Sequence, residues 1–281
     1  MGRLVLLTYA TPAFAAGQRS LCVSALANGF DEVLALGPAD LVGTELARDH
    51  AAILHQPRGA GYWLWKPWLI RHHLQRLNEG DVLFYCDASA DSFYRFDARP
   101  DALLDRLAKT QEGFVIGPLL HQHGPLRHWA KRDALILLDA DRPEIFERPS
   151  LQATWNLWRP TDAAFTLVDS WFDAACDPRI LTDQPNAEGQ PNHLGFIDHR
   201  HDQAILSILA HRDRLPVLDL TDTGIFRAMA LRPQARMTHR YLKSPHAANA
   251  LLGGANAWKK FLGAIVGERI GRAIQGSAAG R

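Results

Sequence analysis

The chain has 281 residues, of which 47% are apolar and 22% charged, values typical of a globular protein with a substantial core. Its formal net charge of +1 gives no reason to expect a nucleic-acid partner, and no stretch reaches the ~20 apolar residues that a membrane-spanning helix needs. The three cysteines are far apart, without metal-ligand or redox spacing, which favours a reducing compartment such as the cytoplasm.

Short apolar runs alternate with helix-like segments through the first half of the chain. The first run is too short for the core of a secretory signal, so it is interpreted as a buried strand. Strands that alternate with helices indicate βαβ units. We therefore expect an α/β fold with a mixed, mostly parallel sheet flanked by helices. The predicted strands are residues 3–10, Glu32–Leu36, Val82–Cys86 and residues 113–117, and the predicted helices are residues 18–28 and 67–77.

The second half is predicted to hold three further helices, the second of them capped by Thr161. A segment rich in Asn, Gln, Pro and Gly, residues 183–195, is predicted to be a loop. The predicted helices are residues 130–139, 161–175 and 202–212, and the predicted strands are residues 152–156 and 215–218.

Two domains are expected: a catalytic domain over residues 1–245 and a basic amphipathic helical tail over residues 246–281. Such a helix can lie on an anionic membrane surface or dock on its own domain. Docking is favoured, because the three glycines at 263, 267 and 271 each weaken an isolated helix by ~1 kcal/mol.

Asp87 is the first candidate for chemistry, because it follows directly after a buried strand. In open α/β sheets, ligands bind beyond the carboxyl ends of the strands. Ser89 and Asp91 extend this polar edge. A divalent cation commonly bridges carboxylates to a diphosphate, so the segment suits a metal site. The alternative is that Asp87 only caps the next turn.

Lys66 is the second candidate, at the start of a predicted helix, where free N–H groups attract phosphate. It lies in a tryptophan-rich segment whose rings cannot all share one face, so that Trp65 or a neighbour is expected to stack on a ligand. The alternative is a solvated lysine and core tryptophans.

The third candidate is the polar run from Asp198 to Gln203, which stands directly before an apolar helix. Asp202 could serve simply as the N-cap of that helix. With Gln203 it could instead hold substrate hydroxyls or act as a base.

In their order and spacing, Tyr62-Trp63-Leu64-Trp65-Lys66-Pro67, Tyr85-Cys86-Asp87-Ala88-Ser89 and His199-Arg200-His201-Asp202-Gln203 resemble bacterial glycosyltransferases of the GT-A type. The resemblance covers roughly residues 1 to 220. It implies a Rossmann-like nucleotide-sugar domain with an Asp-x-Asp metal site.

Asp87 matches the first aspartate of that motif, but the third position is Ser89. Asp91 or the distant His239 would then complete the set of metal ligands for Mn²⁺ or Mg²⁺, and Lys243 would face the donor phosphates.

The resemblance assigns roles to further residues. Asp202 and Gln203 are the expected catalytic pair, and Trp65, Lys66, Asp87, Ser89 and Lys243 are expected to bind the donor. Asn156 and His201 are expected to contact the acceptor, with Gln152 a weaker candidate. The expected metal ligands are Asp87, Asp91 and His239.

A literal Asp-x-Asp occurs at Asp139 and Asp141, but it lies where a helix is predicted to end. Carboxylates at a helix C-terminus oppose the dipole, so this pair is interpreted as a turn.

The leading hypothesis is transfer of a sugar from a nucleoside diphosphate sugar, with a UDP-sugar favoured, to a saccharide or glycolipid acceptor in surface polysaccharide synthesis. The enzyme is expected in the cytoplasm, with the inner membrane face as a peripheral contact. A non-catalytic nucleotide-sugar- or carbohydrate-binding protein is the alternative. A metal-assisted hydrolase using the 199–202 cluster with Asp139 and Asp141 is the least favoured.

Overall fold

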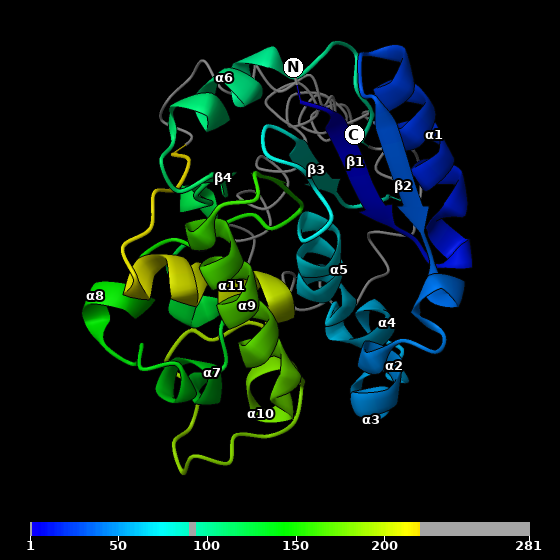
Figure 1. Ribbon diagram of the computed structural model, residues 1–281. Coiled ribbons are helices and arrows are strands. Elements are labelled where there is room, and N and C mark those ends of the chain that lie inside the picture. Colours follow the sequence, from blue (N-terminus) through cyan, green and yellow to red (C-terminus); the bar gives the residue numbers. More distant parts are fainter. Residues whose placement is uncertain (1, 90–93, 220–281) are drawn as a thin grey trace, which may run out of the picture.

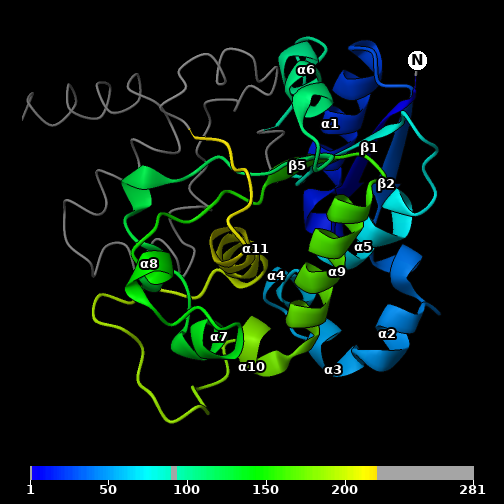
Figure 2. The same cartoon turned by 60° about the vertical axis from the view of Figure 1, so that its left-hand side comes forward.

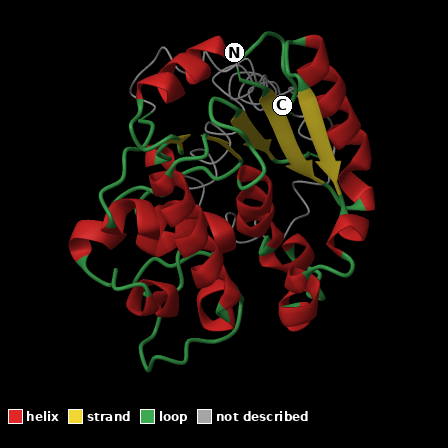
Figure 3. Ribbon diagram, viewed as in Figure 1, coloured by secondary structure: helices red, strands yellow, loops and turns green. Residues whose placement is uncertain are grey.

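The computed structural model describes residues 2–89 and 94–219. Its centre is a five-stranded sheet in the order β2-β1-β3-β5-β4. Figure 3 shows the strands in yellow among the helices in red. β1 pairs in parallel with both β2 and β3, whereas β5 runs antiparallel to its two neighbours, β3 and β4. The predicted α/β fold with a mixed, mostly parallel sheet flanked by helices is therefore confirmed. The strands are β1 (Leu4–Tyr9), β2 (Glu32–Leu36), β3 (Val82–Cys86), β4 (Phe114–Val115) and β5 (Trp155–Trp158).

Both faces of the sheet are covered, which explains why β1 is buried at every position and is apolar except for Thr8. Leu7 and its cross-strand neighbour Tyr85 share a core with α5, α9 and α11. Leu6 and Phe84 face the opposite core, under α1 and α6. Figures 1 and 2 show these two groups of helices on either side of the strands.

In the described ranges, six helices have six residues or more: α1 (Ala15–Ala27), α5 (Trp65–Leu74), α6 (Asp101–Lys109), α7 (Arg132–Leu137), α9 (Asp162–Cys176) and α11 (His201–Arg212). The Thr161 side chain accepts a hydrogen bond from the backbone N–H of Ala164 at 3.2 Å, so the predicted cap of α9 is confirmed. The shorter helices are α2 (Glu45–Asp49), α3 (Ala51–Leu54), α4 (Gly59–Tyr62), α8 (Pro143–Phe146) and α10 (Pro178–Leu181).

Two strand predictions are wrong. A strand is expected over residues 152–156, but β5 begins only at Trp155. All four residues of β5 are buried between the two cores, so this strand does not face a cleft. Residues 215–218 form no strand, although the backbone of Leu218 exchanges hydrogen bonds with Ile116 and Leu119. Within the described ranges, no helix is long and apolar enough to cross a membrane.

Candidate functional site

The candidate site lies at the carboxyl ends of β1 and β3. From β1 the chain turns to one side to form β2 and later returns on the other side as β3, so a topological switch point falls between β1 and β3. Tyr9 ends β1, and its ring stacks on Trp65 of α5 with centroids 4.0 Å apart. Asp87 follows β3, and its backbone N–H donates to the carbonyl of Thr154 at 2.8 Å. Trp65 is thus buried against the sheet rather than open to a ligand.

A buried ammonium group joins the two predicted carboxylates at this point. Lys66 Nζ lies 2.7 Å from Asp202 Oδ2 and 3.1 Å from Asp87 Oδ1. The side chains of Lys66 and Asp202 are only 3% and 6% exposed, whereas that of Asp87 is 26% exposed. The sequence motifs around residues 66, 87 and 202 therefore converge. Of the two carboxylates, Asp87 is the one that clearly reaches solvent.

Local electrostatics alone would not place a lysine here. Lys66 lies in the first turn of α5, where the helix dipole disfavours a cation, while Asp202 lies in the first turn of α11, where the dipole favours an anion. Burial would lower the pKa of Lys66, but Asp202 and Asp87 together raise it above its ordinary value. Lys66 is therefore charged, and it faces two carboxylates instead of the solvent.

Asp202 is the residue of the cluster whose pKa suits a general base near neutral pH. Burial raises the pKa of its carboxyl from 3.8 to about 6, although the Lys66 ammonium opposes this effect. Tyr85 donates its hydroxyl to Asp87 Oδ1, and burial followed by the Asp87 charge raises the pKa of that phenol well above 10. At neutral pH, Tyr85 stays protonated and orients Asp87, while Asp202 is mostly ionised and poised to accept a proton.

The residue after Asp202 is also available to a ligand. Gln203 is half-buried, and the described part of the chain provides no hydrogen-bond partner for its side-chain amide. Gln152 donates its amide to Thr154 Oγ1 at 3.2 Å. Asn156, the predicted acceptor contact, is fully buried in β5 and accepts a hydrogen bond from the Trp158 indole, so its amide faces the protein interior.

The loop that carries Asp87 and Ser89 approaches α1 closely at Gly17. A Cβ atom added at Gly17 would lie 1.6 Å from the carbonyl oxygen of Ser89. Such a separation is impossible between real atoms, so only glycine lets the helix and the loop lie this close. Gly17 thus helps to set the position of Asp87.

Replacing Gly17 with alanine is therefore expected to destabilise the protein by about 1–3 kcal/mol. Without the Ser89 contact, Gly17→Ala would instead stabilise the protein, because alanine is a better helix former than glycine by about 1 kcal/mol. Urea denaturation measures the difference, and Arg19→Ala, on the exposed face of the same helix, is the matched control. A gain in stability from Gly17→Ala would contradict the close approach.

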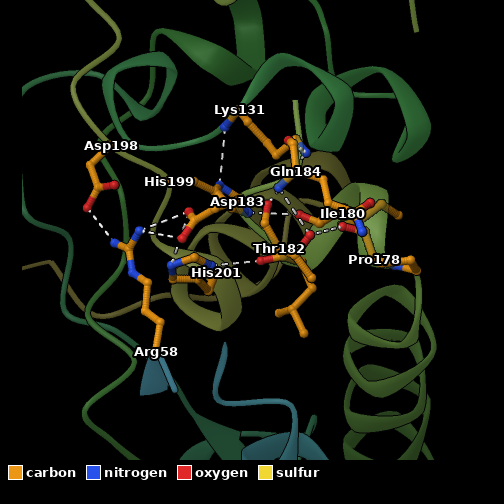
Figure 4. Close-up of polar contacts among 11 residues, drawn as sticks. Arg58, Lys131, Pro178, Ile180, Thr182, Asp183, Gln184, Asp198, His199 and His201 are labelled. Atoms are coloured by element: carbon orange, nitrogen blue, oxygen red, sulfur yellow. Dashed lines mark hydrogen bonds and ion pairs between the residues drawn. The ribbon is translucent and has the colours of Figure 1, made fainter. Parts of the chain in front are cut away.

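His199 and His201 lie just before Asp202, and both are engaged by backbone groups (Figure 4). Burial lowers the pKa of His199 well below 6.5, so its ring is neutral; Nε2 donates to Ile180 O at 2.8 Å, and Nδ1 accepts the Lys131 backbone N–H at 3.2 Å. His201 Nδ1 lies 2.7 Å from Leu181 O. These histidines hold the start of α11 in place, which removes the basis for a hydrolase built on them.

The backbone around the site is strained on two segments that touch. Ala60, Tyr62 and Trp63 all have positive φ, and His201 has φ +46°. Left-handed non-glycine residues cost ~1–3 kcal/mol each and persist only where the surroundings hold them. The His201 ring packs on the rings of Tyr62 and Trp63, with centroids 4.8 and 5.6 Å apart. These ring contacts fix the start of α11 against the segment that leads into Lys66.

Arg58 fastens the predicted loop over residues 183–195 to the same segment. Its guanidinium lies 2.8 Å from Asp183 and 2.7 Å from Asp198 (Figure 4). Lys131 Nζ donates to the carbonyl of Gln184 at 2.7 Å. The loop prediction is confirmed, but the loop is pinned at its beginning by two buried or half-buried cations. Sequence reasoning missed Arg58, Lys131 and Asp183, because charges near glycines or in polar loops usually face solvent.

The start of α11 contradicts the simpler interpretation of Asp202, in which this residue is only the N-cap of the helix. α11 begins at His201, and the N-cap position is Arg200, whose side chain makes no capping hydrogen bond. Asp202 is therefore not the N-cap; its carboxylate turns to Lys66 instead.

The rival Asp-x-Asp pair does not form a metal site. Asp139 follows α7 with φ +52° and an exposed carboxylate, and Asp141 pairs with Arg132 at 3.0 Å and with His193. The interpretation of this pair as a turn is thus supported by its geometry.

The residues that the structure describes do not fit a divalent cation. Within residues 2–89 and 94–219, no group of three or more His, Cys, Asp or Glu side chains could hold a metal. Mg²⁺ is usually held by one or two carboxylates together with waters and substrate phosphates, but here the Lys66 ammonium already stands between the two carboxylates of the site. The predicted ligands Asp91 and His239, the predicted phosphate contact Lys243 and the predicted tail over residues 246–281 lie outside the described residues.

Comparisons with known proteins give distant structural likenesses only. No protein-family model and no curated protein matches the chain. The chain is similar to the apo structure of the bifunctional glycosyltransferase WbbM, with a TM-score of 0.43 and 12% identity over 78% of this chain and 39% of that one, so it spans about two fifths of its length. It is also similar to the galactosyltransferase LgtC in complex with donor and acceptor sugar analogs, with a TM-score of 0.38 and 11% identity over 89% of this chain and 95% of that one.

Proposed function

We propose that this protein is a glycosyltransferase that takes a sugar from a nucleoside diphosphate sugar and passes it to a hydroxyl of a saccharide or glycolipid acceptor. One observation carries the proposal: Lys66, Asp87 and Asp202 come from three distant motifs, yet they meet at the switch point of an α/β sheet. Ligands of this fold class bind at that point. The start of α5 and the start of α11 both lie there, and helix N-termini favour the negative charge of a diphosphate.

Each residue of the cluster has a role in this scheme. Asp202, with a pKa of about 6, accepts the proton of the attacking acceptor hydroxyl. Gln203 holds a sugar hydroxyl with its unpaired amide, and the exposed edge of Asp87 accepts a hydrogen bond from a donor hydroxyl. Lys66 keeps the two carboxylates at fixed positions and neutralises part of their charge. Tyr85 orients Asp87 through its hydroxyl.

The finer features of the hypothesis are proposals of the same kind. A UDP-sugar is the favoured donor, surface polysaccharide synthesis is the favoured setting, and the cytoplasmic side of the inner membrane is the favoured place. Ser89 belongs to the donor site through its position beside Asp87. A requirement for Mn²⁺ or Mg²⁺ depends on Asp91 and His239 and is decided by the experiment below.

The test is a thermal-shift panel of UDP-, GDP-, CDP- and TDP-sugars, each with Mn²⁺ and with EDTA. A ligand at 100 times its dissociation constant stabilises the folded state by about 2.7 kcal/mol, so binding is readily seen. We expect one nucleotide family to raise the melting temperature of the wild type and of Asp105→Asn, an exposed control on α6, but much less that of Asp87→Asn. The proposal fails if no nucleotide sugar shifts the melting temperature.

A second candidate is a non-catalytic protein that binds a nucleotide sugar. It is favoured by one observation, that Ser89 stands where a second carboxylate would be expected. Tight donor binding with neither transfer nor slow donor hydrolysis would select this alternative over the enzyme.

A further inference from the structure

A cavity of about 440 Å³ lies at the other end of α11, away from the candidate site. It is formed by residues 142–148, which include α8, and by the end of α11 with the segment that follows. Figure 2 shows α8 next to α11. At about 1.5 Å of rise per residue, Arg212 at this end of α11 is about 15 Å from Asp202. The size is within the ordinary range of small-molecule sites, which is about 300–1,000 Å³.

Four arginines line this cavity: Arg142, Arg148, Arg212 and Arg214. Among the described residues of the lining, Glu144 is the one carboxylate. Guanidinium groups match phosphate oxygens in a forked geometry and keep their charge at any physiological pH.

Two of the four arginines have their charge already compensated. Arg142 lies 3.5 Å from an Asp139 oxygen, and Arg212 lies 2.7 Å from Asp213. Arg148 and Arg214 are exposed, and the described part of the chain gives their side chains no acceptor. These two guanidinium groups are therefore free to bind an anion.

The remaining lining limits the chemistry of the ligand. Burial lowers the pKa of His211, whose Nε2 lies 2.7 Å from Pro149 O, so the ring is neutral at pH 7 and the positive charge comes from arginine alone. Ile145 and Leu215 give the cavity an apolar part. A ligand that fits both features carries a phosphate group next to an apolar portion.

We propose that this cavity is a second binding site, for a phosphate-bearing ligand with an apolar substituent, in which Arg148 and Arg214 hold the phosphate. The site is separate from the cluster around Lys66 and does not depend on the transfer reaction. The phosphate can belong to a free small molecule or to a lipid headgroup.

The first experiment titrates the full chain with inorganic phosphate and with hexyl phosphate by calorimetry at low ionic strength. We expect hexyl phosphate to bind more tightly than inorganic phosphate, because its hexyl group covers the apolar part of the cavity. The double variant Arg148→Gln/Arg214→Gln should weaken its binding at least about tenfold, since each charge-assisted hydrogen bond contributes ~1.5–3 kcal/mol. Arg19→Gln, exposed on α1, is the matched control and should bind as the wild type does.

Glu144→Gln should have the opposite effect on affinity and tighten the binding of hexyl phosphate, because it removes the negative charge that repels the phosphate. Vesicles of phosphatidylcholine with and without phosphatidic acid separate the two sources. Binding to the phosphatidic acid vesicles that needs Arg148 and Arg214 assigns the phosphate to a lipid, and hexyl phosphate binding alone assigns it to a free molecule. The proposal is overturned if neither probe binds, or if the double variant binds as tightly as the wild type.

Discussion

Replacing Lys66 with methionine is expected to lower the free energy of unfolding by about 3–5 kcal/mol at pH 8. Methionine keeps most of the apolar volume of the lysine stem, so the effect comes from the lost charge. The change leaves Asp202 buried and ionised, without the ammonium group that lies 2.7 Å away in the wild type. Asp87, which is partly exposed, is affected less.

The pH dependence of this loss distinguishes charge from packing. Without Lys66, the main influence that opposes burial is lost, so the pKa of Asp202 in the folded state rises above about 6. An acid whose folded pKa is raised binds a proton more readily when folded, so stability is lost as pH rises from the unfolded pKa through the folded one. The cost of Lys66→Met should therefore be largest at pH 8 and smaller at pH 5, where the carboxyl takes up a proton.

Urea denaturation at the two pH values makes the measurement. Lys109→Met, at the exposed end of α6, is the matched control and should change little at either pH. Adding Asp202→Asn to Lys66→Met should recover part of the stability at pH 8, because the uncompensated charge is gone. An equal loss at pH 5 and pH 8 would mean that Lys66 acts through packing alone.

Asp202→Asn is expected to reduce the proposed transfer by about 10²–10⁴-fold, the usual contribution of a positioned general base. An amide has nearly the shape of a carboxylate and its oxygen can still face Lys66, but it cannot accept the proton of the acceptor hydroxyl. In the wild type, kcat/KM should rise with pH and level off above about 6, as the Asp202 carboxyl ionises. The residual activity of the variant should lack this dependence.

Asp141→Asn is an informative control for this variant. Asp141 belongs to the literal Asp-x-Asp motif, yet it pairs with Arg132 and His193 away from the cluster. We expect it to retain transfer activity. If Asp141→Asn abolished transfer and Asp202→Asn did not, the rival motif would be the functional one. Unchanged pH dependence in Asp202→Asn would remove Asp202 as the base.

Much of the fold could be predicted from the sequence, because the hydrophobic pattern is local. β2 and β3 have the predicted bounds, and α9 begins after the predicted cap Thr161. The position of β5 could not be predicted this way. Its Trp-rich residues are buried on both faces, so they carry no alternating pattern, and its antiparallel pairing between β3 and β4 depends on contacts far apart in the chain.

The sequence also indicated the members of the candidate site without their arrangement. Lys66, Asp87 and Asp202 were each chosen, but their local settings suggested a phosphate contact, a metal ligand and a helix cap. The structure shows an ion cluster instead, because burial of one residue forces pairing with the others. Local rules fail most clearly at Lys66, a cation at a helix N-terminus, and such conflicts concentrate at functional sites.

The strand order also bears on how the protein is made. During synthesis the N-terminal part emerges first, so β1, β2 and β3 can assemble early as a parallel unit. β4 joins the sheet only through β5 and must wait for it. Until residue 202 has been synthesised, Lys66 can pair with Asp87 but not with Asp202. Arrival of α11 delivers Asp202 and completes the charge balance of the core, so the ribosome has passed residue 202 before either the stable fold or the site exists.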